Sequence, residues 1–98
     1  MLFAVICNDK PGSLQLRMDT RPEHLVFLEA LNAKGSLAFA GPFLDSEGKP
    51  NGSLVVVEAP DQKAAELIAG LDPYAKAGLF ASVEIRAWNW TFNKPETA

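Results

Sequence analysis

The order of strand-like and helix-like segments constrains the fold of this 98-residue chain more than any other feature. Residues 2–7, LFAVIC, are continuously apolar and rich in β-forming residues, and the turn residues NDKPGS follow them. A helical pattern covers residues 21–35, with Pro22 near its start and Gly35 just past its end. The first third of the chain is therefore predicted to be a strand, a loop and a helix.

The rest of the chain continues this alternation. Residues 36–43 indicate a strand that stops at Gly41 and Pro42, and a polar loop leads to a third strand at residues 53–59. The following elements are a helix at 61–70 with Asp61 as N-cap, a short helical turn at 72–78 with Asp72 as N-cap, a strand at 79–90 and a frayed or partly extended tail.

This order, β-α-β-β-α-β, is that of a ferredoxin-like α+β fold. Such a fold has a four-stranded antiparallel sheet with its helices on one face. The length of 98 residues fits one domain over residues 1–98, with room for one hydrophobic core.

The first three strands are apolar on both faces. In the first strand Leu2, Ala4 and Ile6 alternate with other apolar residues, and strict alternation places Leu37 and Phe39 on one face of the second. Helices on one side cover only one face, and an exposed apolar face of this size is unusual in a monomer. We therefore expect a homodimer formed through the open sheet face. The alternative is that the tail or the polar loops cover this face.

Charge and composition exclude several functions. The net charge is −3 and no Lys/Arg cluster is present, so nucleic acid is not an expected partner. Apolar runs are far shorter than the roughly 20 residues that span a bilayer, and no leader is recognised, so we expect no membrane association and a cytoplasmic protein. Cys7 is expected to be a buried, inert thiol. One cysteine and one histidine give no metal site, and no glycine-rich phosphate loop indicates a nucleotide cofactor.

The single histidine, His24, is the first candidate functional residue. The helical period aligns it with Leu28 and Leu31, so its side chain is expected to face inward from the first turn of the helix. The positively polarised start of a helix disfavours an imidazolium ion, which would leave a neutral ring that can act as a base. A core histidine bonded to a backbone carbonyl explains the same pattern. Asp72 in LDPY can orient the ring, but an aspartate before proline is also an ordinary helix cap. Asp72 is expected to do both only if one carboxylate oxygen caps the helix and the other reaches His24.

At these residues the chain resembles the YciI-like (YCII-related) family of small proteins. The resemblance rests on RPEHL, AGPF, GSLVVVEA, DPYAKAGLF and VEIRAW in this order and spacing, and it covers most of the chain. It implies a ferredoxin-like dimer with an active site in a cleft. It also implies that His24 acts as general acid/base and that Asp72 orients it.

The resemblance also indicates residues that bind substrate. Arg17 and Arg21 match basic positions that can receive an anionic substrate, although either can be a solvated surface arginine. Ser53 matches the family's GS and can bind a ligand or simply begin a strand. The further pocket residues are Gly41, Pro42, Tyr74 and Trp88, for which a purely structural role is an alternative.

Two classes of function follow from these residues. The first is a small-molecule enzyme in which His24 moves a proton in an elimination, hydrolysis or isomerisation; removal of halide from a chlorinated hydroxyaromatic is one chemistry that the family implies. The second is a non-catalytic dimer that binds a small acid or another protein. The variant His24→Gln separates them, because an enzyme should lose turnover while a binding module should lose affinity.

Overall fold

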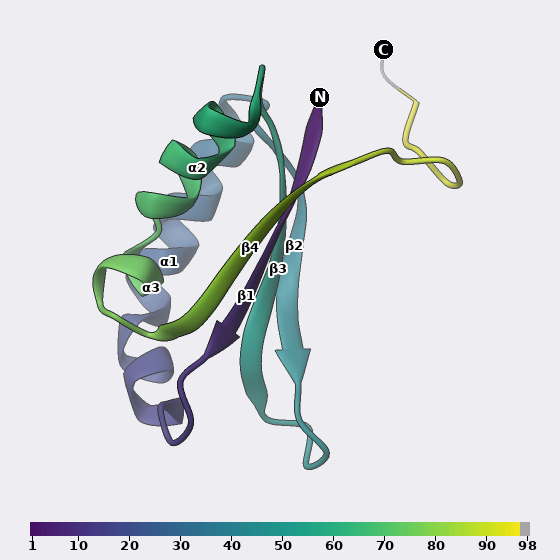
Figure 1. Cartoon of the computed structure of the whole chain (residues 1–98). Helices are drawn as coiled ribbons and strands as arrows, with labels where there is room; N and C mark the ends of the chain where they lie inside the picture. Colours follow the sequence, from purple (N-terminus) through teal and green to yellow (C-terminus); the bar gives the residue numbers. More distant parts are fainter. Residues whose placement is uncertain (97–98) are drawn as a thin grey trace.

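The computed structural model describes residues 1–96, and its elements follow the predicted order. They are β1 (Leu2–Asp9), α1 (Leu14–Ala33), β2 (Leu37–Leu44), β3 (Pro50–Glu58), α2 (Gln62–Gly70), α3 (Pro73–Lys76) and β4 (Phe80–Trp88). The strands form one antiparallel sheet in the order β2-β3-β1-β4, with the helices on one face (Figure 1). The ferredoxin-like α+β class is confirmed. Thr97 and Ala98, the last residues of the predicted tail, lie outside the described residues.

The predicted start of the first helix was wrong. Helix α1 begins at Leu14, and Pro22 lies inside it. The segment LQLRMDTR before the proline is rich in helix-forming residues, which explains the earlier start. Pro22 has no N–H to offer the carbonyl of Met18, but both residues are exposed, so water can satisfy that carbonyl. His24 therefore lies in the middle of α1, where the field of the helix start does not act on it.

The main core lies between the sheet and the helices. Phe3, Val5 and Cys7 point from β1 to the helical side and pack with buried residues of the other elements, which are Leu31, Val55, Val57, Ala59 and Ala65. The Cys7 side chain is buried, as predicted, and burial raises the pKa of this thiol to about 12. Within residues 1–96 no helix is long and apolar enough to cross a membrane.

A β-bulge changes which residues of β2 face the helices. The pairing with β3 shifts between Leu37 and Phe39, so Leu37 pairs with Val57 and Phe39 with Val56. Leu37 packs against the core, whereas Phe39 shares the open face of the sheet with Val56. The strict alternation expected for this strand was therefore wrong, because one extra residue, Ala38, enters the strand.

The open face carries an aromatic cluster. The ring of Phe39 lies 5.6 Å from that of Trp88 and 4.8 Å from that of Trp90 (centroid distances), in edge-to-face geometry. Trp90 follows β4, so the start of the C-terminal tail does pack on this face. Beyond it the tail leads away from the sheet on the side opposite the helices (Figure 1). Dimerisation through this face remains a prediction.

Strand β2 also continues through Gly41 and Pro42, where the sequence had predicted its end. It is one of the two edge strands of the sheet, and an edge position tolerates a proline, which cannot donate a ladder hydrogen bond. After the bulge, Ala40 pairs with Val55 and Pro42 with Ser53. This register places the end of β2 beside α1 on the helical side of the sheet.

Candidate active site

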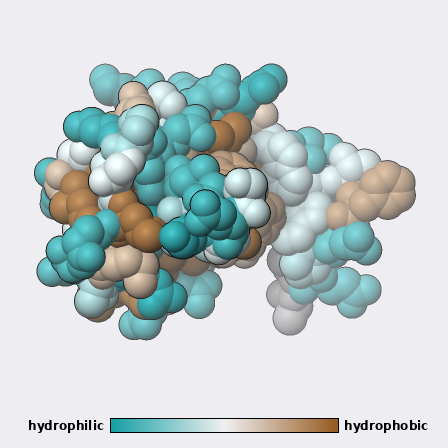
Figure 2. All heavy atoms as spheres, turned by 90° about the horizontal axis from the view of Figure 1, so that it is seen from below, coloured by the Kyte–Doolittle hydropathy of each residue, from teal (hydrophilic) through white to brown (hydrophobic). Residues whose placement is uncertain are grey.

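A pocket of about 460 Å³ opens between α1 and the β2–β3 half of the sheet. Its lining comprises Arg17, Met18, Arg21, His24, Leu25, Leu28, Ala40, Gly41, Pro42, Leu44, Pro50, Ser53, Val55 and Tyr74. Most of these side chains are apolar, as is usual for a site that binds a small organic molecule. Met18 and Leu44 are half-exposed or more, and apolar side chains reach the surface between polar ones when the molecule is viewed from below (Figure 2).

His24 and Asp72 form a buried pair behind this pocket. The Nδ1 atom of His24 lies 2.8 Å from Oδ1 of Asp72, and both residues are less than a tenth exposed. The backbone N–H of Tyr74 donates to the same oxygen at 2.9 Å, which caps α3. The cap and the histidine contact were expected to require separate carboxylate oxygens. One oxygen does both, because a carboxylate oxygen has two lone pairs.

The other ring nitrogen of His24, Nε2, is directed at the pocket. It makes no hydrogen bond within residues 1–96, and in that part of the chain no fully buried polar side-chain atom lacks a partner. Nε2 is therefore accessible, and the pocket is the space that His24 lines. Because an ionised Asp72 can only accept, a neutral His24 ring donates through Nδ1 and keeps a lone pair on Nε2.

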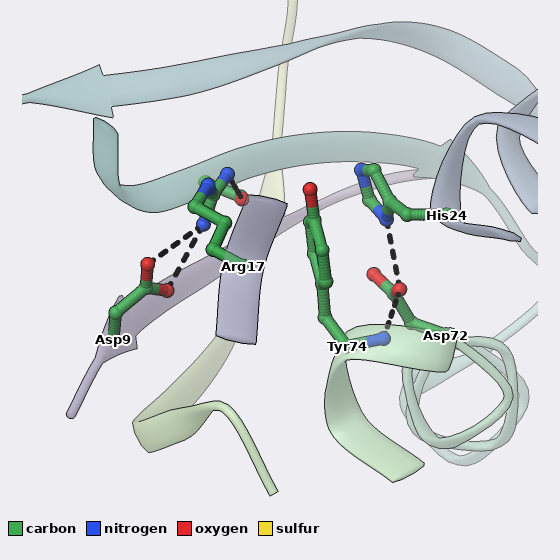
Figure 3. Close-up of polar contacts among 6 residues, drawn as sticks. Asp9, Arg17, His24, Asp72 and Tyr74 are labelled. Carbon is green, nitrogen blue, oxygen red and sulfur yellow. Dashed lines mark hydrogen bonds and ion pairs between the residues drawn. The ribbon is translucent and has the colours of Figure 1, made fainter. Parts of the chain in front are cut away.

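Tyr74 lies against the histidine ring. The two rings are stacked, with centroids 4.0 Å apart and planes 18° from parallel, and their free polar atoms point to the same side (Figure 3). Tyr74 is 1% exposed. Burial raises the pKa of Tyr74, although the positive charges of Arg17 and Arg21 act in the opposite direction. The phenol is therefore protonated at neutral pH.

Arg17 lies on the opposite side of the Tyr74 ring and belongs to a buried ionic group. Its Nη1 donates to Oδ1 and Oδ2 of Asp9, at 3.0 and 2.9 Å, and its Nη2 donates to Oγ of Ser53 at 2.6 Å. Asp9 belongs to the turn residues NDKPGS, so the sequence predicted a loop at this position and indicated no role for the carboxylate. A helix that begins at Leu14 places Arg17 two turns before His24 on the same buried face, and a carboxylate at the end of a buried strand is a natural partner for that arginine. This signal was hidden because the sequence predicted a helix start near Pro22.

The structure brings most of the predicted site residues together. Arg17, Arg21, Ser53, Gly41, Pro42 and Tyr74 line the pocket with His24, and Asp72 lies behind His24. Arg21 is exposed and has no ion-pair partner among the described residues. Trp88 does not line this pocket and lies instead on the open face. In residues 1–96, no three His, Cys, Asp or Glu side chains are grouped as a metal site.

The fold and the pocket define the protein as a small ferredoxin-like domain, in which α1 and α3 hold a histidine against an aspartate. The chain belongs to the YCII-related domain family, whose match covers residues 1–89. It is 35% identical to protein YciI of Escherichia coli over 98 residues, which is 94% of this chain and all of that protein. An uncharacterized protein of Haemophilus influenzae is 32% identical over the same share of both chains.

Solved structures give a similar result. A 5-chloro-2-hydroxyhydroquinone dehydrochlorinase from Burkholderia phenoliruptrix, in complex with 2,5-dihydroxybenzoquinone, superposes with a TM-score of 0.83 at 35% identity. This match covers 91% of the present chain and 94% of the dehydrochlorinase. A NIPSNAP family protein of Agrobacterium tumefaciens matches 96% of this chain and 95% of its own, with a TM-score of 0.55 at 17% identity, and shows the shared fold alone.

Proposed function

We propose that the protein is a small-molecule enzyme in which His24 is the general acid/base and Asp72 orients it. The observation that carries the proposal is the 2.8 Å contact between His24 Nδ1 and Asp72 Oδ1, with Nε2 left accessible in the pocket. A base held in this way typically contributes about 10²- to 10⁴-fold to a reaction rate. The chemistry is lyase- or hydrolase-like, because a general base can remove a substrate proton in an elimination or activate water in a hydrolysis, and neither reaction needs a nucleophilic side chain.

The proposed substrates are small, oxygenated metabolites, aromatic or anionic. The apolar lining suits a ring or a short carbon skeleton, and Arg21, exposed at the pocket and without an ion-pair partner in residues 1–96, suits a negative charge. The dehydrochlorinase relative with its bound quinone supports the aromatic choice. Ser53, Gly41 and Pro42 then shape the sheet side of the pocket.

The first test uses the ligand and the substrate named for that relative. We expect wild-type protein to bind 2,5-dihydroxybenzoquinone and to release chloride from 5-chloro-2-hydroxyhydroquinone. In His24→Gln, turnover should fall by about 10²- to 10⁴-fold while the quinone Kd changes little. If wild type binds without turnover and His24→Gln loses affinity, the protein is a binding module. If neither compound is bound, the aromatic substrate class is wrong.

A second test reads the His24–Asp72 pair without any ligand. In ¹⁵N-resolved NMR at alkaline pH, the single imidazole should carry its proton on Nδ1, because the Asp72 carboxylate accepts there. The variant Asp72→Asn should populate both tautomers, since an amide can donate as well as accept. A wild-type ring protonated on Nε2 would contradict the proposal.

We also propose that the protein forms a homodimer through its open sheet face. Ile6 and Leu54 lie in its centre, and the aromatic cluster adds apolar surface beside them. Sedimentation equilibrium should show a dimer for wild type and a monomer for Ile6→Lys. Val26→Lys adds the same charge to a residue that is 65% exposed on α1 and should leave the dimer intact. A monomeric wild type would refute this interface.

The cytoplasmic location also remains a proposal. A single cysteine that is free and buried is compatible with a reducing compartment. Cell fractionation followed by immunoblotting tests it directly.

A further inference from the structure

The buried group formed by Asp9, Arg17 and Ser53 has no role in the proton transfer proposed above. Three elements supply it, β1, α1 and β3, and the Arg17 guanidinium is held by two bonds to one carboxylate. Arg17 is 4% exposed, and the side chains of the ion pair are each 5% exposed. Because its charge is already matched by Asp9, Arg17 is poorly suited to receive the charge of a substrate.

The position of Arg17 indicates a different role. Its Cζ lies 4.7 Å from the centroid of the Tyr74 ring, and the histidine ring lies on the other face of that ring at 4.0 Å. Figure 3 shows the Tyr74 ring standing between the two side chains. The guanidinium is anchored through both of its terminal nitrogens, Nη1 on Asp9 and Nη2 on Ser53, which fixes its plane beside the aromatic ring. The Tyr74 ring therefore has a defined orientation between Arg17 and His24.

The hydroxyl of Tyr74 is left without a protein partner. Its oxygen makes no hydrogen bond with any residue from 1 to 96, and no fully buried polar side-chain atom in that range is unpaired, so the hydroxyl is accessible from the pocket that Tyr74 lines. It points to the same side as Nε2 of His24 (Figure 3). A protonated donor and a free base thus stand next to each other on two stacked rings.

We propose that Tyr74 donates a hydrogen bond to the substrate oxygen that becomes negatively charged when His24 removes a proton, and that Arg17, held by Asp9, is the positioning residue for Tyr74. This inference rests on the acid/base function proposed above. Nε2 of His24 forms a bond to a C–H or O–H proton of the substrate, and the electron pair of the broken bond moves onto the substrate oxygen. Tyr74 keeps its own proton and stabilises that oxygen, and the imidazolium later returns the proton to product or water.

This arrangement restricts the substrate class. When an O–H proton is removed, the electron pair stays on that oxygen. When a C–H proton next to a carbonyl is removed, the electron pair moves through the carbonyl carbon onto the carbonyl oxygen. The site therefore suits phenols, enols and carbonyl compounds with an acidic neighbouring C–H. It does not suit a substrate that carries no oxygen near the proton to be removed.

A double-variant cycle separates a positioning residue from one that touches the substrate. With 5-chloro-2-hydroxyhydroquinone, Tyr74→Phe should lower kcat by about 10²- to 10³-fold, and Arg17→Lys by about 10- to 100-fold. In the Tyr74→Phe background, Arg17→Lys should lower kcat by less than about twofold more, because the hydroxyl that Arg17 positions is already absent. If the two losses multiply, Arg17 contacts the substrate and the inference is wrong.

If no chloride is released, the same set of variants can be compared by their Kd values for a ligand instead of by kcat. Tyr74→Phe should weaken the Kd for 2,5-dihydroxybenzoquinone by about 5- to 10-fold, the loss expected for one hydrogen bond. Arg17→Lys should again add little in the Tyr74→Phe background. A failure of turnover alone thus contradicts the proposed reaction, whereas an unchanged Kd in Tyr74→Phe contradicts the assignment of Tyr74.

A third readout needs no ligand, because Tyr74 is the only tyrosine of the chain and its ionisation is visible in the ultraviolet. Arg17→Met should raise the pKa of Tyr74 further by removing the cation over its ring, and Asp9→Asn should lower it by removing a nearby negative charge. Asp9→Asn gives an independent result if Arg17→Met does not fold. Arg86→Met, which removes a cation from the open face, should leave the titration unchanged. If neither Arg17→Met nor Asp9→Asn changes the pKa of Tyr74, the positioning role of Arg17 is wrong.

Discussion

The two aspartate caps of this protein allow the energy of the His24–Asp72 contact to be measured against a matched control. Asp61 caps α2 by accepting from the backbone N–H of Ala64 at 2.8 Å, and its side chain makes no other hydrogen bond in residues 1–96. Asp72 caps α3 in the same way and also accepts from His24. The variant Asp61→Ala therefore removes a cap, whereas Asp72→Ala removes a cap and a buried bond.

The expected magnitudes follow from these contacts. Loss of a cap costs about 1 kcal/mol of unfolding free energy, which is the whole effect expected for Asp61→Ala. A hydrogen bond to a charged group adds about 1.5–3 kcal/mol, so Asp72→Ala should cost roughly 2.5–4 kcal/mol. In a domain of this size each kcal/mol lowers Tm by about 4–8 °C, so the two variants should differ by 6 °C or more (on the order of 6–24 °C).

Urea and thermal unfolding at pH 7, followed by circular dichroism, measure both variants. Asp72→Asn adds a further comparison, because asparagine caps a helix about as well as aspartate but carries no charge. The unfolding free energy of Asp72→Asn should lie between those of wild type and Asp72→Ala. If Asp72→Ala and Asp61→Ala agree within about 0.5 kcal/mol, the contact with His24 contributes nothing to stability and the reasoning is refuted.

Three further predictions concern stability. Burial raises the pKa of Cys7 to about 12, so the folded thiol stays protonated at pH values where the unfolded thiol, with a pKa near 9, ionises. From about pH 9 to 12 the unfolding free energy of wild type should therefore fall by about 1.4 kcal/mol per pH unit relative to that of Cys7→Ala, as measured by urea unfolding. Parallel pH profiles of the two proteins would contradict this. Gly52→Ala should cost about 1–3 kcal/mol, because its Cβ would lie 2.6 Å from the Cys7 carbonyl oxygen, whereas the Cβ of Gly70→Ala meets nothing within 4 Å and should be harmless. Pro22→Ala should raise Tm, since it restores a donor for the Met18 carbonyl inside α1; a lower Tm would show that the proline is needed there.

The fold was readable from the sequence because each element carries its own local signal. The apolar run of β1, the turn residues around the hairpin and the Asp61 cap depend on neighbours within a few residues, and the structure has each of them. The start of α1 was not readable, because Pro22 is a strong local sign of a helix start. The helix continues through the proline because the residues before it favour a helix and because Arg17, His24 and Leu31 are buried along one face of α1.

The sequence by itself determined the βαββαβ order, the inward direction of His24 and the family of the chain. Only the tertiary structure decided the contacts of Arg17 with Asp9 and Ser53, and it decided that one oxygen of Asp72 both caps α3 and contacts His24. Periodicity reports which face of an element is buried, but not which residue of another element meets it there. A single-residue bulge at Ala38 was enough to reverse the faces of β2 and to bring Ala40 and Pro42 into the pocket. The chemistry of the site is set by these distances, and they arise only when the layers pack.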